Sequence, residues 1–264
     1  MNLTGISGII FDFGFTLFYF EEATVENYFK SFQIGLNKSV TILKQERLFK
    51  DEKMINKFIN LFNKKRQFFW KESLKTKNEF ETSYIFKHVL KMMVRKNLIP
   101  SIHDFSQEFY DRLAIEFHSE EISRWKPFKH VKTTLESLSR AGIQLAVLSN
   151  HPHHKSIETM LKKHNLFDFF EIVVTSAEFG RRKPAPEIFL HTLKKMNLKD
   201  INPSECLVCG DEYADIVGGH RAGLKTVLCE RKIKFPFEKE INVPNVIRVN
   251  EISEILTLIN FKTI

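Results

Sequence analysis

The second half of the chain alternates between two patterns, and this alternation restricts the fold more than any other feature of the sequence. From Phe128 onward, short apolar runs are separated by longer stretches with helical periodicity. The runs cover residues 143–148, 171–175, 206–209, 226–229 and 246–249. Strands that alternate with helices form a parallel sheet with helices on both faces. The pattern therefore predicts an α/β fold.

A further apolar run, residues 8–11, lies near the N-terminus and far from its companions. If this run joins the same sheet, the residues between are an insertion into a single α/β core. We therefore predict a core made of residues 1–18 and 127–264 and an inserted helical domain over residues 19–126. Because Pro127 disfavours helix at the residue before it, the chain is expected to return to the core there.

The predicted insert shows apolar residues at helical spacing. One stripe consists of Met54, Phe58, Leu61 and Phe62, and another of Phe105, Phe109, Leu113 and Phe117. Such stripes are typical of the packed face of a helix. We expect a small helical bundle with its own core rather than a cofactor-binding surface.

The chain has 264 residues and a formal net charge of +8. Residues 44–77, inside the predicted insert, hold 11 basic and 4 acidic side chains. A basic face can attract an anionic substrate, an acidic partner or nucleic acid. We interpret this one as a solvated helix face, and nucleic acid is not the expected partner. The sequence carries no signal for the oligomeric state.

Neither a membrane segment nor a disulfide framework is expected. No apolar run approaches the roughly 20 residues that span a bilayer. The N-terminus lacks the pattern of a secretory signal, so we expect a cytoplasmic protein. Cys206, Cys209 and Cys229 are too few for a disulfide scaffold. Cys206 and Cys209 are three apart in a predicted strand and would point to opposite faces, which favours core cysteines over a metal or redox pair.

Polar side chains follow two of the predicted strands. Asp12 comes directly after the first run, and Ser149 and Asn150 follow the run that ends at Leu148. An open α/β sheet builds its ligand crevice at the carboxyl ends of its strands. Each of these residues alone could be a turn former or a helix cap. At this edge a hydroxyl could also hold a phosphate oxygen.

Two later segments add a cation and more carboxylates. Lys183 precedes two closely spaced prolines, which stiffen the backbone ahead of a helix. A fixed ammonium can neutralise a nucleophilic carboxylate and a phosphoryl group. Asp211 and Asp215 follow a predicted strand, where oxygen ligands suit Mg²⁺. Clustered acids without a cation would repel one another, and a metal ion removes that conflict.

Together, these four sites resemble the haloacid dehalogenase superfamily of aspartate-nucleophile hydrolases. The resemblance covers the whole predicted core. It is carried by Asp12 with Thr16, by Ser149-Asn150, by Lys183-Pro184-x-Pro186, and by Gly210-Asp211 with Asp215. It implies a three-layer, Rossmann-like parallel sheet with an α-helical cap inserted after the first motif. It also implies a phosphatase that uses Mg²⁺ and acts on a small phosphorylated metabolite.

The resemblance further implies a role for each matching residue. Asp12 would attack phosphorus in line and form an aspartyl-phosphate. Ser149 and Lys183 would hold the phosphate oxygens. Asn150 and Thr16 would add to substrate binding, and Thr16 would order the loop. The implied Mg²⁺ ligands are Asp12, the main-chain carbonyl of Gly14, Asp211 and Asp215, the last directly or through water.

Gly14 departs from the family's pattern. In most phosphatases of this superfamily a second aspartate stands there, protonates the leaving group and later activates water. That role is typically worth about 10²–10⁴ in rate. We therefore expect substrates whose leaving group needs little protonation, or a proton supplied by the substrate or the cap. His151, His153 and His154 lie just past Ser149 and are candidate substitutes, although histidines at a helix entry more commonly have a structural role.

Two alternatives stay open. The dehalogenase branch uses the same nucleophile on carbon without a metal, but it lacks the acid that Asp211 provides here. A binding or regulatory protein could keep the fold and use the basic insert to hold an acidic partner. Retention of Asp12, Lys183, Asp211 and Asp215 argues against a lost site.

Overall fold

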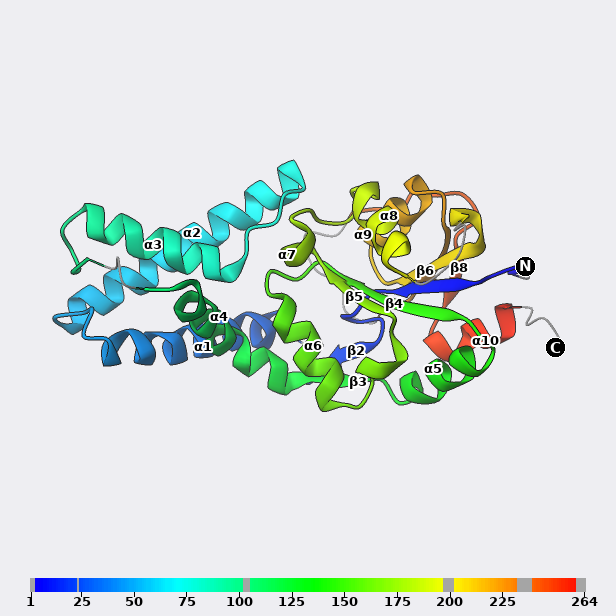
Figure 1. The fold of residues 1–264 in the computed structure, drawn as a ribbon, viewed down its shortest axis with the longest axis horizontal. Helices are drawn as coiled ribbons and strands as arrows, with labels where there is room; N and C mark the ends of the chain where they lie inside the picture. The colour runs from blue at the N-terminus through cyan, green and yellow to red at the C-terminus, as the bar shows by residue number, and fades with distance from the viewer. Residues whose placement is uncertain (1–2, 23, 102–104, 197–201, 232–238, 260–264) are drawn as a thin grey trace. The chain divides into compact units, whose positions relative to one another are not determined.

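The computed structural model describes residues 3–22, 24–101, 105–196, 202–231 and 239–259 (Figure 1). The chain divides into two compact units. The larger consists of residues 1–24 and 125–264, and the smaller of residues 25–124. The smaller unit is narrower at both ends than the predicted insert, because residues 19–24 and 125–126 belong to the larger unit.

The larger unit is built around a six-stranded parallel sheet with the order β5-β4-β1-β6-β7-β8. Its strands are β1 (Gly8–Phe11), β4 (Gln144–Ser149), β5 (Ile172–Thr175), β6 (Cys206–Gly210), β7 (Lys225–Cys229) and β8 (Ile247–Val249). The first strand lies between β4 and β6, where Phe11 is in register with Val147 and Cys209. The predicted α/β class is therefore confirmed, with the N-terminal run at the centre of the sheet.

Helices cover both faces of this sheet and complete three layers (Figure 1). Helices α8 and α9 pack on one face, and α5 and α10 lie on the other. The helices of this unit are α5 (Val131–Arg140), α6 (His154–Lys163), α7 (Ser176–Phe179), α8 (Pro186–Lys195), α9 (Tyr213–Arg221) and α10 (Ile255–Leu258). Short 3₁₀ turns are η1 (Phe167–Phe169), η2 (Pro203–Glu205) and η3 (Ile252–Glu254). Burial of the central strands on both faces explains why they appear in the sequence as continuous apolar runs.

Two short strands at the ends of the predicted insert were not anticipated. β2 (Phe18–Phe20) and β3 (Trp125–Pro127) pair in antiparallel fashion, with Phe20 opposite Trp125. The predicted helical insert over residues 19–126 therefore has strand rather than helix at these two ends. Strands of three residues are too short to show a period of two, so no pattern in the sequence distinguishes them from a hinge.

The smaller unit contains four helices in its described part. They are α1 (Val25–Gln45), α2 (Glu52–Thr76), α3 (Thr82–Arg95) and α4 (Gln107–Arg124). Asp51 caps α2 by accepting a hydrogen bond from the backbone N–H of Met54 at 2.7 Å. Phe58, Phe62 and Phe117 are buried in one apolar cluster, so both predicted phenylalanine stripes face a helical core.

Close contact between α1 and α4 depends on Gly35. A β-carbon at this position would lie 1.8 Å from the backbone oxygen of Phe117, so only glycine fits. One turn further, the buried Ser39 hydroxyl donates to the backbone oxygen of Leu113 at 2.9 Å. The two helices therefore cross with their backbones nearly in contact.

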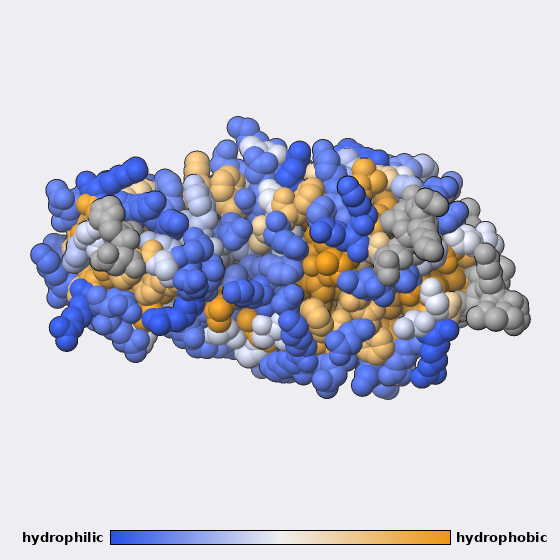
Figure 2. All heavy atoms as spheres, viewed as in Figure 1, coloured by the Kyte–Doolittle hydropathy of each residue, from blue (hydrophilic) through white to orange (hydrophobic). Residues whose placement is uncertain are grey.

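No helix in the described part of the chain is long and apolar enough to cross a bilayer. Figure 2 shows hydrophilic residues over most of the visible face, with an apolar area over the larger unit. Cys206, Cys209 and Cys229 are buried and free, as expected for core cysteines.

Candidate functional site

Asp12 stands directly after the central strand of the sheet. Its backbone N–H donates to the backbone oxygen of Cys209 at 2.8 Å, which continues the pairing of β1 with β6 by one residue. The side chain is buried, with 8% of the residue exposed. The strand thus delivers a carboxylate to the edge of the sheet where ligands bind in open α/β folds.

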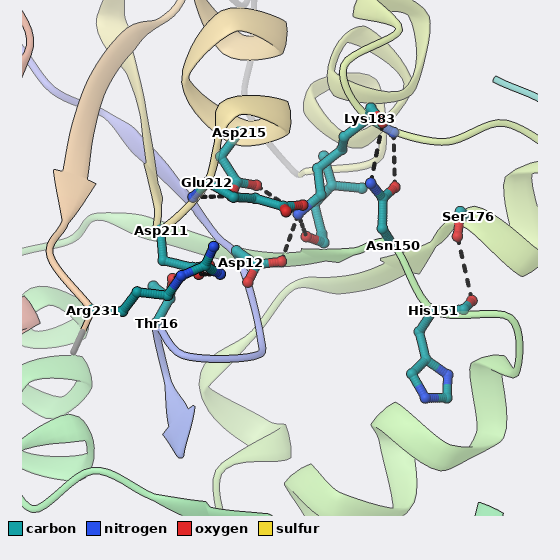
Figure 3. Close-up of polar contacts among 11 residues, drawn as sticks. Asp12, Thr16, Asn150, His151, Ser176, Lys183, Asp211, Glu212, Asp215 and Arg231 are labelled. Carbon is teal, nitrogen blue, oxygen red and sulfur yellow. Dashed lines mark hydrogen bonds and ion pairs between the residues drawn. The ribbon is translucent and has the colours of Figure 1, made fainter. Parts of the chain in front are cut away.

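Lys183 contributes a buried ammonium to the same edge (Figure 3). Its Nζ donates to Asp12 Oδ1 at 2.5 Å, to Asp215 Oδ1 at 2.6 Å and to the backbone oxygen of Leu148 at 2.8 Å. An ammonium has three donors, and these contacts use all of them. The ion pair therefore joins three distant segments of the chain.

Asn150 holds the backbone from which Lys183 projects. Its Nδ2 donates to the backbone oxygen of Lys183 at 3.1 Å, and its Oδ1 accepts from the backbone N–H of Lys183 at 2.8 Å. The amide thus makes two hydrogen bonds to one residue, as Figure 3 shows. The resemblance predicts a substrate contact for Asn150, whereas both of these hydrogen bonds hold the backbone of Lys183.

Asp215 lies in the first turn of α9 and packs against Gly210. Its Oδ2 accepts from the backbone N–H of Glu212 at 3.2 Å, which closes a capping box at the start of the helix. A β-carbon on Gly210 would lie 2.2 Å from Asp215 Cγ. Glycine at the end of β6 is therefore required for the carboxylate to reach Lys183.

Asp211 uses its two carboxylate oxygens differently. Oδ1 accepts a long hydrogen bond of 3.5 Å from Thr16 Oγ1. Oδ2 is paired with the guanidinium of Arg231, whose side chain is 10% exposed. That guanidinium also lies 5.8 Å from the centroid of the Phe15 ring. The segment that follows Asp12 is thus connected to Asp211 on the side of the cluster away from Lys183.

The pKa values reflect a buried and crowded set of charges. Burial raises the pKa of Asp12, and the adjacent Lys183 opposes this effect. Burial likewise raises the pKa of Asp215 to about 6 against the opposing Lys183. The pKa of Asp211 lies well above its usual value because of burial and the carboxylates of Asp12 and Asp215. Burial alone would lower the pKa of Lys183, but Asp12, Asp215 and Glu212 outweigh it and raise this pKa.

The donor set fits a hard divalent cation. Asp12, Asp211 and Asp215 each offer a carboxylate oxygen, and these oxygens lie within 4.8 Å of one another. Carboxylate oxygens at this separation suit Mg²⁺, which takes one or two carboxylates and keeps several waters. Burial is the main cause of the raised pKa values of the three acids, and a bound cation would favour their ionised forms.

The amino-acid sequence of the chain matches the profile of a known protein family. The profile of the haloacid dehalogenase-like hydrolases aligns with residues 9–229, which run from the central strand to the end of β7. The chain belongs to this family. The resemblance inferred from the four motifs is therefore confirmed, as is the assignment to the hydrolases.

Individual relatives in the family are phosphatases by name. The chain is 34% identical over 124 residues to a phosphoglycolate phosphatase from Aquifex aeolicus (strain VF5), which covers 47% of this chain and 56% of that protein. It is 29% identical over 167 residues to pyrophosphatase PpaX from Bacillus mycoides (strain KBAB4), covering 62% and 71% respectively. The matched segment thus spans little more than half of the Aquifex protein.

Solved structures of the family share the fold at low sequence identity. A 2-haloacid dehalogenase from Pseudomonas syringae pv. tomato DC3000 superimposes with a TM-score of 0.62 at 18% identity. The alignment covers 96% of this chain and 97% of that one. This similarity supports the three-layer fold of the haloacid dehalogenase-like hydrolases.

Gly14 stands where the resemblance predicts a second aspartate, and Trp125 lies beside it. A β-carbon on Gly14 would lie 3.1 Å from Cη2 of Trp125. The indole is 5% exposed and makes edge contacts with the rings of Phe13, Phe15 and Phe20 at centroid distances of 5.8, 5.2 and 5.3 Å. A β-carbon on residue 14 would therefore press against the indole of this aromatic cluster.

Ser149 is the last residue of β4 and is in register with Thr175 on β5. It is 6% exposed. Because β4 is the direct neighbour of β1, Ser149 and Asp12 reach the same edge of the sheet from adjacent strands. This placement agrees with the expected role of its hydroxyl beside a phosphate.

The three candidate histidines make local contacts at the start of α6. His151 Nδ1 accepts from the backbone N–H of His153 at 3.1 Å. His153 Nδ1 lies 2.7 Å from Ser156 Oγ, and His154 Nδ1 lies 3.1 Å from Thr175 Oγ1. In Figure 3 the ring of His151 lies apart from the cluster around Asp12 and points away from it. These contacts favour the structural interpretation of all three.

The structure brings most of the predicted residues together. Those that meet at the carboxyl edge of the sheet are Asp12, Thr16, Ser149, Asn150, Lys183, Asp211 and Asp215. Arg231 and Trp125 were not identified from the sequence. Arg231 stands at the start of a basic run in the sequence, and Trp125 lies just before Pro127, where the sequence predicts only the return of the chain to the core.

Proposed function

We propose that the protein is a Mg²⁺-dependent phosphatase that acts on a small phosphorylated metabolite through an aspartyl-phosphate on Asp12. The observation that carries the proposal is the Lys183 ammonium, which donates to Asp12 and Asp215 in a buried setting. A buried cation beside a carboxylate favours the ionised, nucleophilic form. The phosphatase names of two relatives support the same reaction class.

The two carboxylate oxygens of Asp12 would have different tasks. Oδ1 accepts from Lys183, which leaves Oδ2 as the attacking atom. In the first step Oδ2 would bond to phosphorus as the bond from phosphorus to the leaving oxygen breaks. In the second step water would attack the same phosphorus, release inorganic phosphate and regenerate the carboxylate. Ser149 would hold a phosphate oxygen during both steps. Lys183 would give up one of its three present contacts to hold another phosphate oxygen.

Metal binding would complete the site. Asp12, Asp211, Asp215 and the main-chain carbonyl of Gly14 would hold Mg²⁺, which when bound supplies positive charge to the phosphoryl oxygens and to the crowded acids. Asp215 also accepts from Lys183 and from the Glu212 backbone. Its contact with the ion through water is therefore more compatible with these hydrogen bonds than a direct bond.

Substrate choice would follow from Gly14 and Trp125. Neither a glycine nor an indole packed against aromatic rings can donate a proton to a departing alkoxide. Leaving groups that are weak bases, as in phosphoanhydrides, acyl phosphates and aryl phosphates, need no such donor. We therefore propose that the rate rises steeply as the leaving group becomes more acidic.

A panel of phosphorylated metabolites with Mg²⁺ tests the proposal, with Asp12→Asn as the control. We expect phosphate release that EDTA stops and that the substitution abolishes. A series of aryl and alkyl phosphates then measures the dependence on leaving-group pKa. Activity unaffected by Asp12→Asn would overturn the mechanism, and a flat leaving-group dependence would overturn the role given to Gly14.

The dehalogenase alternative is tested in the same experiment. The fold of a 2-haloacid dehalogenase superimposes on this chain, but fold similarity at 18% identity does not transfer an activity. Chloride release from 2-chloropropionate in the presence of EDTA would favour carbon–halogen hydrolysis. Absence of turnover on every substrate, together with tight binding of an acidic protein, would favour a regulatory role.

A further inference from the structure

Arg231 contacts the part of the acidic cluster, formed by Asp12, Asp211 and Asp215, that Lys183 does not reach. Lys183 donates to Asp12 and Asp215, whereas the guanidinium of Arg231 is paired with Asp211 Oδ2. Both partners of this second pair are buried, at 10% and 3% side-chain exposure. Two cations of the protein's own thus pair with the cluster, one on each side.

The position of Arg231 is set by the end of β7 and by an aromatic ring. Arg231 follows Glu230, the first residue after the strand, and its guanidinium lies 5.8 Å from the centroid of Phe15. Phe15 directly precedes Thr16, whose hydroxyl donates to Asp211 Oδ1. The guanidinium is therefore held against the carboxylate by a cation–π contact as well as by charge.

We propose that Arg231 and a divalent cation compete for the Asp211 carboxylate, so that Arg231 lowers the affinity of the site for Mg²⁺. The inference rests on the metal site of the proposed function. Mg²⁺ approaches a carboxylate oxygen to about 2.1 Å and requires near-octahedral geometry. A guanidinium already bonded to Oδ2 blocks that approach, and Arg231 must withdraw before the ion binds Asp211 through this oxygen.

The size of the effect follows from the charges. A unit charge at a separation of roughly 6 Å from a divalent ion changes its binding by about tenfold even in a medium as polar as water. The pair is buried, so screening is weaker than in water. Removal of the Arg231 charge is therefore expected to tighten Mg²⁺ binding by at least about tenfold.

A role for Arg231 in orienting Asp211 predicts the opposite change in Mg²⁺ affinity. An arginine that only orients Asp211 would hold the carboxylate ready for the metal, and its loss would weaken binding. The sign of the change in affinity therefore separates competition from orientation.

Calorimetric titration of the full chain with MgCl₂ tests the proposal without reference to activity. Wild type is compared with Arg231→Gln and with Arg248→Gln. Arg248 is a matched control, because it pairs with Glu230, which follows the neighbouring strand β7, its side chain is 54% exposed and it carries the same charge. We expect about tenfold tighter binding by Arg231→Gln and a change of less than about twofold for Arg248→Gln. Equal or weaker binding by Arg231→Gln overturns the proposal.

Arg231→Lys provides a second test of the proposal in case Arg231→Gln fails to fold. Lysine keeps the charge but loses the forked donors, so its hold on Asp211 is weaker. Its Mg²⁺ affinity should lie between those of wild type and Arg231→Gln, and an affinity equal to or below that of wild type overturns the proposal.

The outcomes for the proposed function are distinct. If wild type binds Mg²⁺ without phosphatase activity and Arg231→Gln binds it more tightly, the competition stands and the phosphatase does not. If the protein is an active phosphatase and the two affinities are equal, only the competition fails. If neither protein binds Mg²⁺, both fail.

Discussion

The indole of Trp125 lies 3.1 Å from the point that a β-carbon on Gly14 would occupy. The two residues are far apart in the sequence, and the pairing of β2 with β3 brings them together. A side chain on residue 14 would therefore press against the indole. The glycine and the tryptophan are thus one structural feature.

Gly14→Asp alone should not restore acid catalysis. Its side chain would be forced against the indole, and overpacking of this kind costs typically about 1–3 kcal/mol of the free energy of unfolding. The double variant Gly14→Asp/Trp125→Ala provides the room. We expect it to raise the rate on alkyl phosphates by one to several orders of magnitude, up to about 10²–10⁴.

Trp125→Ala is the control for this pair, because it creates the space without the acid and should leave alkyl phosphates poor substrates. Steady-state kinetics on one alkyl and one aryl phosphate measure the difference. A single Gly14→Asp variant that is both stable and active on alkyl phosphates would show that Trp125 does not obstruct residue 14.

Lys183→Met should destabilise the protein strongly. It leaves the carboxylates of Asp12 and Asp215 buried without their shared cation, a change that costs about 3–5 kcal/mol. Lys162→Met is the matched control, because Lys162 pairs with Glu158 at 3.0 Å on the surface and should contribute less than about 1 kcal/mol. Urea unfolding at neutral pH compares the two variants, and equal losses of stability would contradict the interpretation.

Stability in the absence of divalent cations should fall as the pH rises through about 6. The pKa of Asp215 is raised from 3.8 to about 6, so between these values the folded protein binds more protons than the unfolded chain. The protonated Asp215 therefore contributes about 3 kcal/mol to the free energy of unfolding. This contribution is fully present below pH 3.8 and is lost as the pH rises above the folded pKa of about 6.

Urea unfolding with EDTA at pH 5 and pH 7.5 measures this effect, and Mg²⁺ should restore stability more at the higher pH. Asp215→Asn is the control, because it removes the titrating group and should flatten the dependence in this window. The prediction would be contradicted if the stability of the wild type in EDTA rose between pH 5 and pH 7.5 and that of Asp215→Asn rose less.

Asn150→Ala should reduce kcat more than it changes KM. The substitution removes both hydrogen bonds that hold the backbone of Lys183, at a cost of about 1–3 kcal/mol in stability. Lys183 would then reach Asp12 less often, which slows the chemical step. Asn202→Ala, which removes a local cap from η2, serves as the control. A rise in KM alone would instead support the substrate contact expected from the sequence.

The positions of the strands could be predicted because the central strands are buried on both faces. The run predicted at residues 206–209 is the strand Cys206–Gly210, and similar agreement holds for the other strands of the sheet. Asp12 and Asp211 could also be identified, because each follows such a run directly. The edge at which these residues meet was thus predictable from apolar runs that are followed by polar residues.

Contacts that depend on long-range packing could not be predicted in this way. The pairing of Arg231 with Asp211 depends on the direction in which the chain leaves β7, and an arginine in a basic segment gives no sign of it. The same is true of Asn150, whose partner is a backbone rather than a side chain. Only the folded chain shows that Trp125 takes the space beside Gly14.

The central place of β1 has a consequence for the order in which the chain assembles on the ribosome. Its neighbours β4 and β6 begin at Gln144 and Cys206, so the first strand to be synthesised waits for most of the chain before either edge is paired. The helices of residues 25–124 have their own apolar cluster and can fold during that interval. Asp12 is therefore among the first residues made, and its surroundings are among the last to form.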